Sequence, residues 1–124
     1  MVYDNTMTAL HSEDSPVYIR LRGGIAAAIL RGDFRSGDQL PSVRALAAEH
    51  GANPLTVAKA YQSFQDDGYV EVRRGVGMFV LPGAAERLRV AERAMFVDTQ
   101  WPRIRDHIAL LGLDPADLLE RAVG

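Results

Sequence analysis

The chain has 124 residues, of which 48% are hydrophobic, and its 14 Lys and Arg against 16 Asp and Glu give a formal net charge of −2. This length suffices for one modest core, so we expect one compact domain with an appendage. The absence of cysteine excludes disulfides and cysteine-based zinc sites. No apolar run reaches the roughly 20 residues that span a bilayer, and residues 1–15 lack the basic start of a secretory signal. We therefore expect a cytoplasmic protein.

Residues 1–15 are polar and without periodicity, which predicts a flexible N-terminal arm. The first helix is predicted to start at Ser15-Pro16, because serine is a favoured N-cap and proline suits the first helical position. Its apolar stripe runs to about Arg31 and contains Tyr18, Leu21, Ile25 and Ile29. Gly23-Gly24 weakens this helix, and close packing of another element against that face is one explanation.

Two further helices follow almost without a break. Ser42 is the predicted N-cap of the second, and Gly51 suits the left-handed position that ends it. Only Ala52 precedes the next start at Asn53-Pro54. The core-facing residues of the third helix, spaced i, i+4 and i+7, are Val57, Tyr61 and Phe64.

Two extended segments come next, at residues 69–73 and 78–81, and both are rich in valine and aromatic residues. The glycines of the link Arg74-Gly75-Val76-Gly77 suit a tight hairpin. A helix, a helix–turn–helix and then a hairpin is the order of a winged helix-turn-helix. The predicted fold is therefore mainly α with a small β-hairpin: a winged domain over residues 16–82, followed by a two-helix C-terminal tail over residues 83–124.

The tail contains apolar residues that alternate steps of four and three, the spacing of a helix–helix seam. The seam residues are Val90, Ala94, Val97, Trp101, Ile104, Ile108 and Leu111. One amphipathic helix and a short second helix from Asp114-Pro115 cannot bury them, so we expect homodimerisation, with intramolecular packing as the alternative. Pro102 either kinks the first tail helix or lies in the first turn of a new one.

Several polar and basic residues are candidates for DNA contact, because side chains near the N-terminus of a recognition helix reach base edges in the major groove. The third helix supplies Asn53, Leu55, Thr56 and Lys59, the second supplies Arg44, and the hairpin tip supplies Arg73 and Arg74. Leu55 suits a thymine methyl group. The alternative for each residue is an ordinary solvated surface.

Enzymatic chemistry is not indicated by the sequence. His11, His50 and His107 lack metal-ligand spacing, and Gly75-Val76-Gly77 lacks the remaining features of a phosphate-binding loop. We therefore predict no catalytic residues, no metal and no cofactor.

The motifs of residues 16–82 resemble the DNA-binding domain of the GntR family of bacterial repressors. The resemblance lies in Pro16-Val17-Tyr18, in the run from Gly37 to Ala47, in the run from Asn53 to Tyr61, and in the wing-like run from Arg73 to Val80. A tail of about forty residues is similar to that of the YtrA-like branch, where it serves dimerisation. The DNA contacts that the resemblance implies are Ser42, Arg44, Asn53, Thr56, Lys59, Arg74 and Gly75. It also implies neighbouring transporter genes as targets and leaves a small-molecule effector unidentified.

Two hypotheses follow. The first is a homodimeric, sequence-specific repressor that binds double-stranded operator DNA and is associated with the nucleoid. The alternative is a winged-helix protein-interaction module without DNA binding, which the net negative charge suits. Under the first hypothesis the basic residues act through their placement rather than their number.

Overall fold

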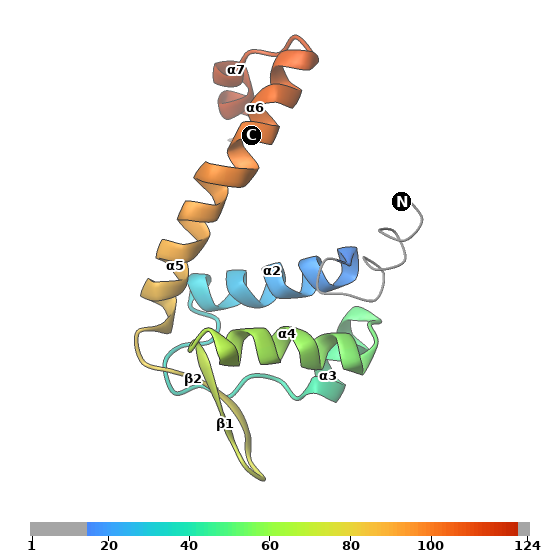
Figure 1. Cartoon of the computed structure of the whole chain (residues 1–124), viewed down its shortest axis with the longest axis vertical. Coiled ribbons are helices and arrows are strands. Elements are labelled where there is room, and N and C mark those ends of the chain that lie inside the picture. The colour runs from blue at the N-terminus through green and yellow to red at the C-terminus, as the bar shows by residue number, and fades with distance from the viewer. Residues whose placement is uncertain (1–14, 122–124) are drawn as a thin grey trace. The chain divides into compact units, whose positions relative to one another are not determined.

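The computed structural model describes residues 15–121. The described residues form two compact units, and the boundary between them lies between Leu88 and Arg89. Their elements, in chain order, are α2 (Pro16–Arg31), α3 (Val43–His50), α4 (Pro54–Asp66), β1 (Val70–Arg73), β2 (Gly77–Val80), α5 (Ala84–Met95), the π-helical segment η1 (Phe96–Gln100), α6 (Trp101–Leu110) and α7 (Pro115–Arg121). The predicted mainly helical fold with one hairpin is confirmed (Figure 1). The predicted N-terminal arm lies outside the described residues, apart from Ser15.

The helices of the first unit begin and end at the predicted capping residues. The side chains of Ser15, Ser42 and Asn53 accept hydrogen bonds from the backbone N–H groups of Tyr18, Ala45 and Leu55, respectively. Gly51 ends α3 at φ 60°, where a residue without a Cβ avoids a steric penalty. These contacts lie within a few residues of each other, which is why the sequence alone located the helix starts.

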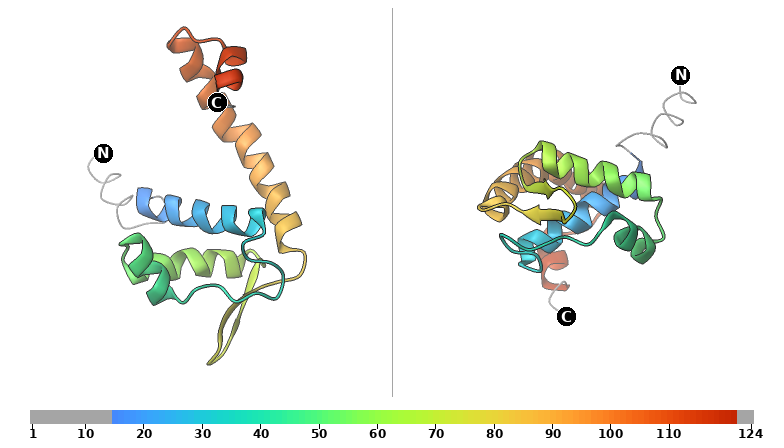
Figure 2. Two further views of the ribbon diagram at one scale, coloured as in Figure 1. Left: turned by 180° about the vertical axis from the view of Figure 1, so that it is seen from behind. Right: turned by 90° about the horizontal axis from the view of Figure 1, so that it is seen from below.

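The core of the first unit lies where α4 packs against α2, α3 and β1. Its fully buried large side chains are Phe64, Ile29, Leu88, Val57 and Val70. Ala84 and Leu88 of α5 belong to this core, so the first unit extends past the predicted boundary at residue 82. Figures 1 and 2 (left) show α2 on one side of α4, with α3 and the projecting hairpin on the other.

The hairpin pairs β1 with β2 in antiparallel register, from Val70 opposite Val80 to Arg73 opposite Gly77. Both strands differ by a residue at their ends from the predicted ranges of 69–73 and 78–81. The segment before α3 pairs with this two-stranded sheet through an isolated β-bridge between Gln39 and Phe79. Hydrogen bonds of 2.8 Å from the Gly37 and Leu40 N–H groups to carbonyls of β2 hold this segment in place.

Gly23 and Gly24 are not explained by close packing. Both are exposed, and a Cβ added at either would meet no heavy atom within 4 Å. The explanation we considered from the sequence is therefore wrong for the described part of the chain, and nothing else in the structure explains why α2 contains two interior glycines.

The second unit begins within α5, at Arg89. From there α5, η1 and α6 follow one another without a loop, and α7 turns back beside α6 (Figure 1). Pro102 lies in the first turn of α6, directly after η1. Within an α-helix, a proline ring would collide with the carbonyl four residues earlier, here that of Asp98 in η1. The wider π turn removes this collision. Pro102 therefore lies in the first turn of α6, which is one of the two predicted alternatives, although α6 follows η1 without a loop and without a capping side chain.

Candidate nucleic-acid interface

The N-terminal half of α4 presents its candidate residues on the face opposite the core. With Val57, Ala60, Tyr61 and Phe64 buried, helical geometry directs Leu55 and Lys59 outward and puts Thr56 at the flank. Leu55 is 64% exposed, so its side chain is accessible to a partner. Asn53 uses its side-chain oxygen in the cap, at 2.8 Å from the Leu55 N–H, and retains its amide N–H₂ as a donor.

The start of α3 carries Ser42 and Arg44, both exposed. The Ser42 Oγ accepts from the Ala45 N–H at 3.0 Å, which leaves its own hydroxyl proton available. The buried Tyr61 hydroxyl donates to the Pro41 carbonyl at 2.6 Å and ties α4 to the segment that leads into α3. Burial, together with the negative charge of Glu49, raises the pKa of Tyr61 to about 12, so this donor keeps its proton across the neutral range.

Arg73 and Arg74 at the hairpin tip have different surroundings. Arg73 pairs with Glu71 at 3.2 Å, and its guanidinium carbon lies 4.1 Å from the centroid of the Phe79 ring. Residues two apart on a strand share a face, and Phe79 lies directly opposite Glu71, so these three side chains are neighbours. Arg74 lies in the loop itself, beside Gly75. The φ of Gly75 is 77°, in the left-handed region that glycine adopts without a steric penalty. Arg73 is therefore already engaged within its own hairpin.

Three of the candidate cations have no such partner. Among residues 15–121, Arg44, Lys59 and Arg74 make no hydrogen bond or ion pair with another described residue. They come from α3, α4 and the hairpin loop, respectively. Since no side chain among the described residues occupies their donor groups, these donors are available to a phosphate group. Asp66 and Asp67 lie at the opposite, C-terminal end of α4.

Sequence reasoning missed Gln39. Its side-chain Nε2 donates to the Val76 carbonyl in the hairpin loop at 2.8 Å, across 37 residues of sequence. It stands in a turn-rich stretch with no periodic pattern, so no local signal distinguishes it from other exposed polar residues. Only the pairing of this segment with β2 brings it to the hairpin.

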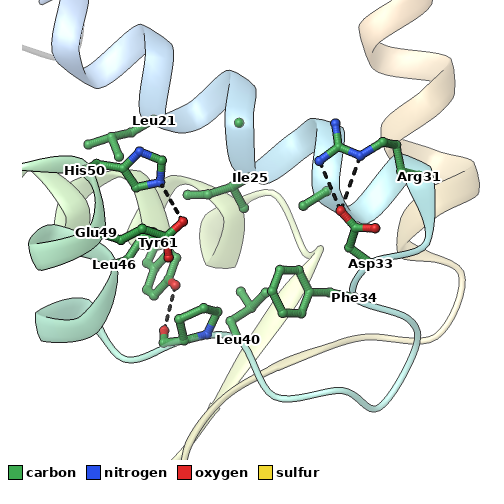
Figure 3. A pocket seen from close by; sticks show the side chains of 13 residues that line it. Leu21, Ile25, Arg31, Asp33, Phe34, Leu40, Leu46, Glu49, His50 and Tyr61 are labelled. Carbon is green, nitrogen blue, oxygen red and sulfur yellow. Dashed lines mark hydrogen bonds and ion pairs between the residues drawn. The ribbon is translucent and has the colours of Figure 1, made fainter.

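A cavity of about 390 Å³ lies beside α3, between α2, α4 and the segment that follows α2 (Figure 3). Its walls are mostly apolar and include Leu21, Ile25 and Phe34. Figure 3 shows the Tyr61–Pro41 hydrogen bond along the cavity, together with a contact of 3.6 Å between His50 Nε2 and the Glu49 carboxylate and an ion pair between Arg31 and Asp33. A cavity of this size with a few polar groups suits a small molecule.

The model of the family described as bacterial regulatory proteins, gntR family, matches residues 18–80. The chain belongs to the GntR family. The matched residues run from the first turn of α2 to the end of β2 and include every predicted DNA-contact residue. The predicted resemblance to this family, made on the motifs alone, is confirmed.

Among GntR-family relatives, the HTH-type transcriptional repressor YtrA of Bacillus subtilis is 38% identical over 60% of this chain and 57% of its own length. A GntR family transcriptional regulator from Listeria monocytogenes has the same fold, with a TM-score of 0.66 and 22% identity over 90% of this chain and 96% of that one. The structure of Streptococcus agalactiae BusR in complex with its busA-promotor DNA aligns with a TM-score of 0.55 and 25% identity, over 83% of this chain and 52% of that one. The first two of these relatives are described as a transcriptional repressor and a transcriptional regulator, the class of protein that the sequence predicted.

The chain spans 60% or less of the length of the first curated relatives it matches. Within residues 15–121, none of the helices combines the length and the apolar character needed to cross a membrane.

Proposed function

We propose that this GntR-family chain is a sequence-specific DNA-binding transcription regulator that acts as a homodimer and represses a nearby operon, with transporter genes as the expected class of target. The observation that carries the proposal is the set of three unpartnered cations, Arg44, Lys59 and Arg74, on three elements of a winged helix-turn-helix. The named repressor among its relatives and the promoter complex of BusR support the same reading.

In this proposal the N-terminal half of α4 enters the major groove. Lys59 and Asn53 supply donors to base edges or phosphates, and Leu55 contacts a thymine methyl group. Arg44 and Ser42 reach the backbone beside the groove, and Arg74 with Gly75 follows the flanking backbone or minor groove. Arg73 steadies the hairpin through Glu71 and Phe79 and contributes less to DNA contact.

The net charge of −2 is compatible with this function because only the local charge at the interface meets the DNA. The acidic pair Asp66 and Asp67 lies at the end of α4 that would point away from the groove, since the recognition helix contacts bases through its N-terminal residues. We therefore expect weak non-specific affinity, with useful binding only when two subunits bind together.

Homodimerisation is supported by the exposure of the second unit. None of the residues 89–121 is buried in the single chain, so this unit has no core of its own. Its exposed large hydrophobic residues are Val90, Met95, Phe96, Val97, Trp101, Ile104, Leu110, Leu111, Leu113 and Leu119. Such a surface is expected to be covered in solution, and a second copy brings a matching one.

The π-helical segment adds a detail to the proposed seam. A π turn inserts about one residue into the helical repeat, which rotates the following side chains by roughly 100°. It therefore separates Val90, Ala94 and Val97 from Trp101, Ile104, Ile108 and Leu111, so the two groups do not form one straight stripe. We expect both groups to contact the partner subunit, each from its own face of the tail helix.

Sedimentation velocity tests the dimer. The double variant V97E/I104E, which puts a carboxylate in each group of the seam, should convert a dimer into a monomer. The matched control T99E adds a carboxylate to the same segment outside the seam and should leave the dimer intact. A wild-type monomer at micromolar concentration, or a V97E/I104E dimer, would contradict the proposal.

Electrophoretic mobility shift of the intergenic DNA beside its own gene tests DNA binding. The wild-type protein should retard this fragment at low salt. K59A should weaken binding by about 1–3 kcal/mol if Lys59 contacts a base edge, whereas R44A should weaken binding to all sequences alike and reduce its salt dependence, as expected for a lost phosphate contact. The control is E86A, a charge change in the first turn of α5. A protein that retards no fragment, and is also monomeric, would favour the interaction module instead.

We further propose the cavity beside α3 as the place where a small-molecule effector would bind. An occupant there would contact α2, α3 and the Tyr61–Pro41 hydrogen bond, and so would act on the segment that leads into the interface. Screening of small apolar molecules by amide chemical shifts tests this. Binding that shifts Ile25 and Phe34 and is lost in I25W would support it, and binding unaffected by I25W would contradict it.

A further inference from the structure

The hairpin loop of residues 74–76 is joined to the rest of its unit by one side chain. Within residues 15–121, the only hydrogen bond that joins this loop to the unit outside the hairpin is the one that Gln39 Nε2 donates to the Val76 carbonyl at 2.8 Å. The Val76 N–H is used within the hairpin, where it donates to the Arg73 carbonyl at 2.9 Å.

Apolar packing does not replace this bond. A groove of about 270 Å³ lies between the hairpin and the start of α3, and Val72 and Val76 at its hairpin side are more than half exposed. Gln39 is itself among the residues that line this groove. The hydrogen bond from Gln39 to Val76 therefore holds the loop in place, as packed apolar side chains hold the other elements of the unit.

The neighbouring glycine is fitted to the same contact. Gly77 has a φ of 146°, and a Cβ added there would collide with the Gln39 amide group. A side chain at position 77 would therefore displace the Gln39 amide from its hydrogen bond with the Val76 carbonyl, and glycine leaves that bond intact.

We propose that Gln39 is a positioning residue for DNA binding, which holds the hairpin loop at a fixed place relative to the N-terminus of α3. Gln39 precedes the Ser42 cap and Arg44 by only a few residues, and it grips the loop that carries Arg74. One short segment therefore links the cation on α3 to the cation on the hairpin. This inference rests on the proposed DNA-binding function.

The physical gain is pre-organisation. A two-stranded hairpin is marginally stable by itself, and a loop that must be ordered on binding costs affinity. Because the loop is already ordered in the free protein, the conformational entropy of the loop that carries Arg74 is lost on folding and does not reduce the affinity for DNA. Removal of the Gln39 donor should leave the fold unchanged, because Gln39 is exposed, but should release the loop.

Backbone order parameters of the full chain test the contact. In Q39A and in Q39E, which keeps the size but loses the donor, the values at Gly75 and Val76 should fall toward those of flexible segments, below about 0.6. The control S36A, in the same stretch before α3, should leave them unchanged. If loop order is the same in Q39A as in the wild-type protein, the inference is overturned.

A double-mutant cycle tests the role in binding. Q39A should weaken operator affinity roughly three- to tenfold, the range expected for one net hydrogen bond. In the R74A background the same change should have a clearly smaller effect, because the loop then contributes no cation and only Gly75 is left to contact the DNA. An equal penalty in both backgrounds would overturn the positioning role.

The two arms separate this inference from the proposed function. If no variant and no wild-type protein binds operator DNA, the proposed function fails, and with it the role of Gln39 in binding, whereas the order parameters still report whether it holds the loop. If K59A weakens binding and R74A does not, DNA binding stands but the hairpin has no part in it, and the positioning role of Gln39 is rejected.

Discussion

Substitution of the two adjacent hairpin arginines, one at a time, distinguishes charge number from charge placement. Each loses the same charge, but Arg73 is paired with Glu71 at 3.2 Å and covers the Phe79 ring, whereas Arg74 has no ion-pair partner among the described residues. If placement decides, R74A should weaken DNA binding and its salt dependence more than R73A does.

The magnitude follows from counterion release. Each phosphate contact contributes about −0.9 to the slope of log K against log salt concentration. Arg44, Lys59 and Arg74 from each of two proposed subunits give about six contacts and a slope near −5. R74A removes two of them, so the slope should move toward zero by about 1.8, and R73A should move it by less than half as much.

Fluorescence anisotropy with a labelled operator, from about 50 to 200 mM salt, measures this slope. Over that range wild-type affinity should fall about a thousandfold and that of R74A about a hundredfold. Circular dichroism and sedimentation control for folding and dimerisation. R73A should instead lower the free energy of unfolding by about 0.5–1 kcal/mol, the value of an exposed cation–π contact. A slope flattened as much by R73A as by R74A would refute the assignment of Arg73 to its own hairpin.

Two further predictions concern the winged unit. Gly23→Ala should raise the free energy of unfolding, measured in urea, by about 1 kcal/mol. An added Cβ meets no heavy atom within 4 Å there, and alanine restricts the unfolded chain more than glycine does. A loss of stability would instead indicate a contact at Gly23 that the single chain lacks. The pKa of Tyr61 is about 12 in the folded chain, against its ordinary value of 10.0. Above pH 10 the unfolded chain therefore loses this proton before the folded chain does. The contribution of Tyr61 to the free energy of unfolding is fully present below pH 10 and should decline as pH rises toward 12. In Tyr61→Phe the alkaline decline, followed by thermal unfolding between pH 9 and 12, should be shallower, and an equal decline would assign it to other groups.

Much of the winged unit could be predicted from the sequence because its signals are local. Each N-cap residue and the N–H group that it binds lie within three residues of each other, and the core positions of α4 repeat at helical spacing. The glycines between the two hairpin strands likewise report a turn in their own neighbourhood. Because these signals come from residues close together in the sequence, the family motifs could be recognised, and the candidate residues on α3, α4 and the hairpin could be predicted.

What the sequence left open depends on contacts between distant residues. The unit boundary moved because Leu88 is buried in a core built by residues from α2 to β2, which no local pattern reports. The difference between Arg73 and Arg74 depends on the strand register that brings Phe79 beside Glu71. The spacing of the apolar tail residues assumes one regular helix, but the structure has the π-helical segment η1 within it, because the Pro102 ring needs a wider turn.

The sequence by itself determined the order of the elements, their capped starts and the kind of side chain at the candidate interface, because these depend on residues a few positions apart. The tertiary structure decided which of the basic residues are unpartnered, and it brought Gln39 to a carbonyl 37 residues away. The physical reason is that hydrogen bonds and charges act through space. Whether a charged group is available to a partner therefore depends on which neighbours the folded chain brings to it.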